Sequence, residues 1–302
     1  MRRSRIALIA LLAATLRAQV PQPEAKPAPT LVVRIECAAP GSPVPRTTDP
    51  KAPAAALRAR RWEGRKLVWH IGDTLKVDTL VGLERELRRI AQDPASMRDS
   101  VDQPGKKELL PVLLRPGDDA RWCDVTQSFD VAMMAGFYAI SIDGAGTPWF
   151  VPKMVDHPLL DAGALIVPKV LFNEPDDRPD PRRPVFEVHQ DGRIVVDGVT
   201  LFTWVAGKAD DLEPLRARLA ELRADLVARG HLVKRPSDRR EMLDVPLLVC
   251  ADVWTEWRDV RRLLQVVTDP SVGFWKLEVG VAEFDYEAKL RDATKATPAE
   301  KR

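Results

Sequence analysis

A repeat with a spacing of 135 residues constrains the fold of this chain more than any other feature of its sequence. Residues 67–134 align without a gap to residues 202–269, with 12 identities in 68 positions, where ordinary composition gives about five by chance. Among the identities are Trp69 with Trp204, Leu80 with Leu215, Trp122 with Trp257, and Asp124 with Asp259. The periodic apolar positions coincide as well, which is a physical constraint and not only a match of letters. The chain is therefore predicted to contain two copies of one structural unit.

The stretch 245–278 holds the clearest half of this unit. It begins with an apolar run at 245–251, typical of a buried strand. A predicted amphipathic helix follows, in which Trp257, Val260, Leu264 and Val267 lie on one face. Pro270 ends this helix, and Gly273 leads into a last strand at 274–279.

The remaining apolar runs extend this pattern over most of the chain. For the first copy we expect strands at 31–36, 66–71, 109–114 and 137–142 and helices near 80–90 and 122–132. For the second copy we expect strands at 185–189, 193–196, 200–205, 245–251 and 274–279 and helices at 212–226 and 257–267. The expected fold is α+β, with two copies of a β-β-α-β-α-β unit, each a small sheet with two helices packed on it.

Segments of distinct composition surround the two copies. Residues 1–18 read as a signal peptide, because a basic start precedes an apolar run at 6–16 and a small residue, Ala18. An uncleaved anchor is the alternative, although a membrane-spanning helix needs about 20 apolar residues. The predicted organisation is a Pro/Ala-rich tether at 19–30, a first domain at 31–144 with an insertion at 37–65, a Pro-rich linker at 145–184, a second domain at 185–284 and a charged tail at 285–302.

The charge and the cysteine content exclude several classes of protein. The formal net charge is +2, and four arginines near the start of the chain account for the excess, so a nucleic-acid partner is not expected. Membrane association is expected only if the N-terminal segment stays uncleaved. Export permits disulfides, but the odd number of cysteines leaves at least one of Cys37, Cys123 and Cys250 unpaired. Buried small hydrophobes are the favoured interpretation, and their disulfide state is left open.

The residues that stand out in the repeat have structural explanations first. Trp122 and Trp257 begin an apolar helix face, which favours core packing over ligand stacking. Asp124 and Asp259 lie in the first helical turn, where a carboxylate interacts favourably with the helix dipole. Asp252, at the end of a strand, is a plausible helix cap. The predicted structural or interaction residues are Trp69, Trp204, Trp122, Trp257, Asp124, Asp259, Asp252 and Gly273.

The second copy resembles the periplasmic domain of the ExbD/TolR biopolymer-transport family. The resemblance rests on Ala251-Asp252, Trp257, Val260, Val266-Val267 and Gly273, and on a hairpin-like stretch at 185–199 with turns at Asp191-Gly192 and Asp197-Gly198. Residues 31–143 resemble the family less, because Gly117 stands where the aspartate is expected and an insertion interrupts the opening hairpin. The family also has an N-terminal membrane helix with an acidic residue for proton coupling, whereas the short apolar run here has none.

The resemblance implies an exported, periplasmic or cell-envelope interaction module, an accessory to transmembrane transport that binds an envelope protein or peptidoglycan. Because the family's domains pair, the two copies are expected to form an intrachain pseudo-dimer. A peptidoglycan- or polysaccharide-binding protein is the alternative, with an exported enzyme as a less favoured one. The four histidines have no ligand spacing, and neither a nucleophile motif nor a phosphate loop occurs, so no enzyme activity, cofactor or metal is predicted.

Overall fold

The computed structural model describes residues 29–45, 51, 60–100, 105–145, 150–154, 165, 167–170, 183–203, 212–234 and 241–283. The predicted signal peptide, nearly all of the tether and the charged tail lie outside the described residues. The described part is a mixed α+β protein, which confirms the predicted fold class. Its α-helices are α3 (Leu80–Ala91), α4 (Trp122–Met134), α6 (Glu213–Ala228) and α7 (Trp257–Val267), and its strands form several small sheets.

The first sheet is built around β1 (Leu31–Ala39). This strand pairs in antiparallel fashion with β4 (Lys66–Ile71) and in parallel with β8 (Val112–Pro116). The edge strands are β5 (Leu75–Val77), next to β4, and β9 (Ile140–Ile142), next to β8. Leu109 belongs to another hairpin, so β8 begins three residues later than the sequence predicts.

The second sheet is built around β12 (Val185–Val188). This strand pairs in antiparallel fashion with β13 (Arg193–Val196) and in parallel with β17 (Leu247–Ala251). On the β13 side follows β14 (Val199–Thr203), and on the β17 side follow β18 (Leu277–Glu283) and β10 (Phe150–Met154). Every residue of β17 is buried, as its unbroken apolar sequence predicts.

Three two-stranded hairpins lie in segments for which the sequence predicts no strand, except for Leu109. They are β2 (Ser42–Pro45) with β3 (Arg60–Glu63), β6 (Met97–Asp99) with β7 (Lys107–Leu109), and β15 (Leu232–Lys234) with β16 (Glu241–Leu243). A short 3-10 helix, η1 (Pro94–Ser96), precedes β6. Each of these strands has only three or four residues, which is too short to show the apolar alternation that marks a strand in a sequence.

The Pro-rich linker at 145–184 contributes to the second sheet. Both β10 and β11 (Lys169–Val170) pair in parallel with β18. In the segment between β10 and β11, Leu165 and Val167 are buried against Leu248 and Cys250. The apolar middle of the linker thus packs on the second sheet, as its composition predicts.

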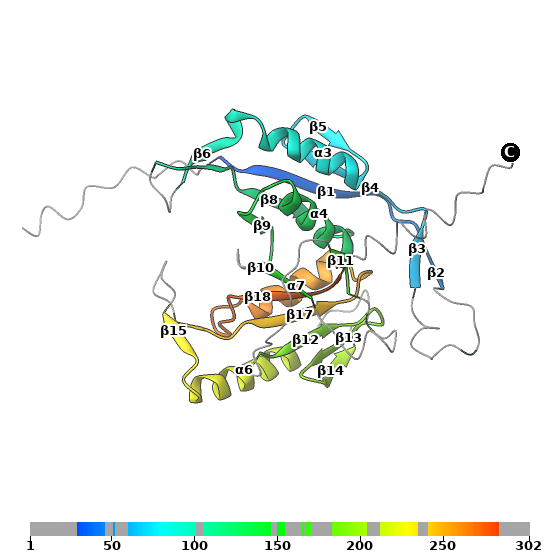
Figure 1. Cartoon of the computed structure of the whole chain (residues 1–302). Coiled ribbons are helices and arrows are strands. Elements are labelled where there is room, and N and C mark those ends of the chain that lie inside the picture. The colour runs from blue at the N-terminus through cyan, green and yellow to red at the C-terminus, as the bar shows by residue number, and fades with distance from the viewer. Residues whose placement is uncertain are drawn as a thin grey trace, which may run out of the picture.

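The helices bury the faces that their sequence periodicity predicts. In α3 the hydroxyl of Thr79 accepts a hydrogen bond from the Gly82 backbone N–H at 3.0 Å, which caps the helix, and Leu83 and Leu87 are buried. Figure 1 shows α4 and α7 in the middle of the molecule, between the two sheets. No helix within the described residues is long and apolar enough to cross a membrane.

Candidate functional site

The N-termini of α4 and α7 meet and exchange backbone hydrogen bonds. The first N–H groups of an α-helix have no acceptor within the helix, so they need partners from elsewhere. Here each helix uses carbonyl groups from the loop before the other helix. The four donor–acceptor pairs are Trp122 to Thr255 at 2.8 Å, Cys123 to Val253 at 3.1 Å, Trp257 to Ala120 at 2.7 Å and Arg258 to Asp118 at 3.2 Å. The two helices therefore cap one another.

Trp122 and Trp257 stack at the centre of this contact. Their ring centroids lie 6.1 Å apart and their planes differ by 3°, which is an offset parallel arrangement. Both side chains are fully buried. The structure thus joins two residues that lie 135 positions apart, and each is buried against the other's helix.

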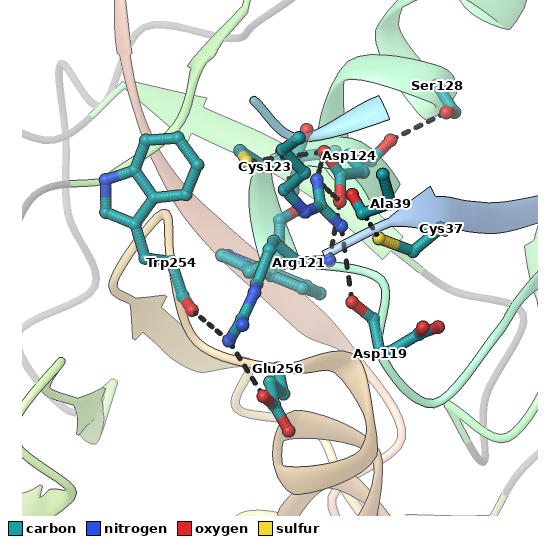
Figure 2. Close-up of polar contacts among 12 residues, drawn as sticks. Cys37, Ala39, Asp119, Arg121, Cys123, Asp124, Ser128, Trp254 and Glu256 are labelled. Carbon is teal, nitrogen blue, oxygen red and sulfur yellow. Dashed lines mark hydrogen bonds and ion pairs between the residues drawn. The ribbon is translucent and has the colours of Figure 1, made fainter. Parts of the chain in front are cut away.

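Arg121 links the two helices by its side chain. Its Nη1 donates to the Trp254 carbonyl oxygen and forms an ion pair with Glu256, both at 3.0 Å, as Figure 2 shows. The guanidinium also lies over the Trp62 ring, 4.0 Å from its centroid. Burial lowers the pKa of Arg121, and the neighbouring Glu256 carboxylate opposes that shift. Sequence reasoning did not identify Arg121 or Glu256.

Asp124 forms a second buried polar contact, one turn into α4. Its carboxylate accepts hydrogen bonds from the Arg121 backbone N–H at 2.6 Å and from Arg65 at 2.8 Å. Arg65 lies in the chain between β3 and β4, and its Nη2 also donates to the Asp119 carbonyl oxygen at 3.2 Å. Burial raises the pKa of the Asp124 carboxyl, while the Arg65 charge and these hydrogen bonds act in the opposite direction.

A hydrogen-bonded chain connects this helix to the first sheet. The Ser128 hydroxyl donates to the Asp124 carbonyl oxygen at 2.6 Å and accepts a hydrogen bond from Trp69 Nε1 at 2.8 Å. Trp69 lies in β4 and is buried. Trp69 therefore fixes α4 on its sheet. Trp204, its counterpart in the repeat, lies outside the described residues.

The other predicted residues lie on the α7 side and differ in role. Asp259 lies in the first turn of α7, as predicted, but its side chain is partly exposed. Asp252 is buried and accepts a hydrogen bond from the Trp254 backbone N–H at 3.0 Å, which forms a turn before the helix. The N-cap residue of α7 is Glu256, so the prediction that Asp252 caps the helix is wrong. Gly273 has φ +85°, a conformation that favours glycine.

Two cysteines border the Asp124 cluster, as Figure 2 shows. Cys123 Sγ contacts Asp124 Oδ1 at 3.6 Å, and Cys37 Sγ donates to the Ala39 carbonyl oxygen at 3.2 Å. None of the three cysteines of the chain, all of which lie within the described residues, forms a disulfide. Burial raises the pKa of Cys37, and it raises that of Cys123 well above the usual value. Both thiols therefore stay protonated near neutral pH and are poor nucleophiles.

A small pocket lies between the β12–β13 turn and the start of α7. It has a volume of about 140 Å³, and Arg121, Trp254, Glu256 and His189 are among the residues that line it. Pockets for drug-sized ligands are typically about 300–1,000 Å³, so this one is small. Among the described residues, no group of three or more His, Cys, Asp or Glu side chains lies close enough to hold a metal ion.

His189 in this pocket has a defined tautomer. Arg193 Nη2 lies 3.3 Å from His189 Nδ1, and an arginine only donates, so Nδ1 accepts. Nε2 lies 2.9 Å from the Glu187 carboxylate, which only accepts, so Nε2 carries a proton and donates it in this hydrogen bond. His189 and Glu187 are both buried. This geometry holds the β12–β13 turn in place, which is a structural role.

No family model matches the chain, and no curated protein matches it.

Proposed function

We propose that the chain is an exported, non-enzymatic interaction module built from two ExbD/TolR-like units that pair within one chain. We name residues 31–144 the N unit and residues 185–284 the C unit. The mutual capping of α4 and α7 carries this proposal, because such a reciprocal contact is how a symmetric dimer is assembled. In this proposal the paired units act as a protein–protein adaptor in the cell envelope, without the proton-coupling membrane helix of the family.

The order of strand pairing supports a duplication. Within the main sheet of each unit, the first strand (β1 or β12) pairs in antiparallel fashion with the next strand of that sheet (β4 or β13). It pairs in parallel with the strand just before the second helix (β8 or β17). A third strand continues the antiparallel side in each unit, and the last strand continues the parallel side. The unit proposed here is therefore β-β-β-α-β-α-β. Its additional strand is β5 in the N unit, where the sequence predicts no strand, and β14 in the C unit, where the sequence predicts a strand at 200–205.

The spacing of 135 residues supports the duplication in the second half of each unit. Adding 135 to the residues of β8 gives those of β17, and the first residues of α4 and α7 correspond in the same way. The buried faces agree as well: Trp122, Val125, Phe129 and Ala132 correspond to Trp257, Val260, Leu264 and Val267.

The same spacing does not hold in the first half of each unit. The buried Leu83 of α3 would correspond to the partly exposed Arg218 of α6. Likewise Trp69 lies in β4, the counterpart of β13, whereas Trp204 comes in the sequence directly after Thr203, the last described residue of β14. Insertions and deletions in the loops between strands shift the alignment there, so Trp69 and Trp204 are not equivalent positions in this proposal.

Light scattering on residues 19–302 tests the proposed intrachain pairing. We expect the mass of one chain over micromolar concentrations, together with slow hydrogen exchange of the Trp122 and Trp257 amides, because these amides donate across the contact. The amide of Tyr138, an exposed residue outside any helix or strand, is the control for fast exchange. A mass of two chains, or fast exchange at both tryptophans, contradicts the proposal.

A binding assay separates a protein adaptor from a polymer binder. Purified residues 19–302 should remain in the supernatant when incubated with peptidoglycan sacculi, as they should with cellulose as a control polymer. The reason is that the pocket at the start of α7, with a volume of about 140 Å³, is too small to enclose several sugar rings. Retention on sacculi, but not on cellulose, contradicts the adaptor and favours peptidoglycan binding.

A further inference from the structure

The contact between the two units is symmetric in its backbone. Its four hydrogen bonds form two pairs whose residues differ by 135 in number. The bond from Trp122 to Thr255 corresponds to the bond from Trp257 to Ala120, and the bond from Cys123 to Val253 corresponds to the bond from Arg258 to Asp118. Trp122 and Trp257 correspond to each other in the same way and stack on each other. A pseudo-two-fold axis therefore passes through the contact, as in a dimer in which the same surface of each partner meets itself.

The side chains next to this axis are not symmetric. Arg121 and Glu256 occupy the same position in the two units, and they face one another as an isolated antiparallel bridge pair. Their side chains form the 3.0 Å ion pair, with exposed fractions of 9% and 22%. In a contact between two identical units this position would face a copy of itself, and two like charges would meet in a largely buried site.

A second ion pair across the contact is also one-sided. Arg261 of α7 donates to Asp118 of the loop before α4 at 2.9 Å. The corresponding positions on the other side of the axis are Thr126 and Val253, which carry no charge. Neither unit can therefore form this ion pair with a copy of itself.

From these asymmetries we infer that Arg121 and Glu256 select the partner: they make the N unit pair with a C unit and prevent two N units or two C units from pairing. The inference rests on the proposed pairing of units within one chain. The backbone and tryptophan contacts alone accept any combination of units, because they are nearly the same from either side. Charge complementarity then supplies specificity by penalising the wrong pairs. The surface around the axis is thus complementary to one kind of partner: a unit that carries the opposite charge at the position of Arg121 or Glu256.

Charge-exchange variants of residues 19–302 test this inference. Arg121→Glu and Glu256→Arg each place two like charges at the axis, so each should lower the folding equilibrium constant by roughly 100-fold in urea unfolding. The double variant Arg121→Glu/Glu256→Arg restores opposite charges. Its folding equilibrium constant should therefore be lower than that of wild type by no more than about 10-fold, which is half of the 100-fold loss on a logarithmic scale. Arg229→Glu, which reverses a charge in an exposed ion pair of α6, is the matched control and should change little.

Partner choice is read directly by mixing. Alone, each single variant carries the same charge on both of its units, so its units repel one another. When the two single variants are mixed, every unit of one carries the charge opposite to that of every unit of the other. When the two single variants are unfolded and refolded together, we expect light scattering to detect a two-chain species. Neither variant should form this species alone. As a control, a mixture of the Arg229→Glu variant with wild type should not form it either. Additive losses in the double variant, or a mixture that contains only single chains, overturn the inference. If wild type itself forms two-chain particles, it is the proposed intrachain pairing that fails.

Discussion

Trp122→Ala is expected to lower the free energy of unfolding by about 3–5 kcal/mol, the range for truncating a fully buried tryptophan. The loss has two sources: the transfer free energy of the indole ring and the cavity that it leaves between α4 and α7. Because the two rings stack on each other, Trp257→Ala should give a loss of similar size. A single such substitution removes a large fraction of the stability of an ordinary domain.

Urea unfolding of both single variants and the double variant measures this effect. We expect the double variant to lose less than the sum of the two single losses, by about 0.5–1.5 kcal/mol, because the second substitution no longer breaks an aromatic pair. Tyr138→Ala is the control, since this side chain is 74% exposed and its removal should change stability by no more than about 0.5 kcal/mol. Losses below about 1 kcal/mol for both tryptophans would show that the stack does not hold the helices together.

Apolar periodicity was sufficient to predict the elements that carry the contact. The helix at Trp257–Val267 follows from the spacing of its apolar side chains, because it buries one face. The strand at Leu247–Ala251 follows from an unbroken apolar run, because all of its residues are buried. The strands from the linker could not be assigned in this way. β10 and β11 form by pairing with β18, more than 100 residues away, and a sequence pattern does not specify such a partner.

The same distinction applies to the candidate site. Trp122, Trp257 and Asp124 are visible in the sequence because they recur at a spacing of 135. Arg121 and Arg65 are not, because a charged residue is normally solvent-exposed and nothing local marks its partner. One signal could have identified Arg121: in the repeat it corresponds to Glu256, an exchange of charge directly before two identical tryptophans.

Mutual capping explains why the tryptophan pair and the backbone contact occur together. The four N–H groups at the two helix N-termini each contribute about 0.5–1.5 kcal/mol net when bonded to carbonyls of the other unit instead of water. These hydrogen bonds require the loop before each helix to lie close to the N-terminus of the other helix. The stacked rings of Trp122 and Trp257 hold the two helix N-termini at that distance. The contact therefore orders the loop 117–121, which contributes the Asp119 carbonyl to Arg65.

Asp124→Asn should lower the free energy of unfolding by about 3–5 kcal/mol, because it leaves the buried Arg65 guanidinium without its carboxylate partner. The substitution keeps the size of the side chain, so a packing defect does not contribute. Asp259→Asn is a control that the repeat itself provides: it is the same change at the corresponding position, on a side chain that is 22% exposed, and we expect a loss below about 1 kcal/mol.

A second substitution distinguishes loss of the ion pair from loss of the helix cap. Arg65→Met removes the buried cation, so Asp124→Asn in that background should cost much less than in wild type. The hydrogen bond from the Arg121 backbone N–H remains available to the asparagine oxygen in both backgrounds. If Asp124→Asn costs the same with and without Arg65, capping of α4 and not the ion pair accounts for the buried carboxylate. Urea unfolding of the four proteins at one pH measures the coupling, and a value above about 1.5 kcal/mol supports the ion pair.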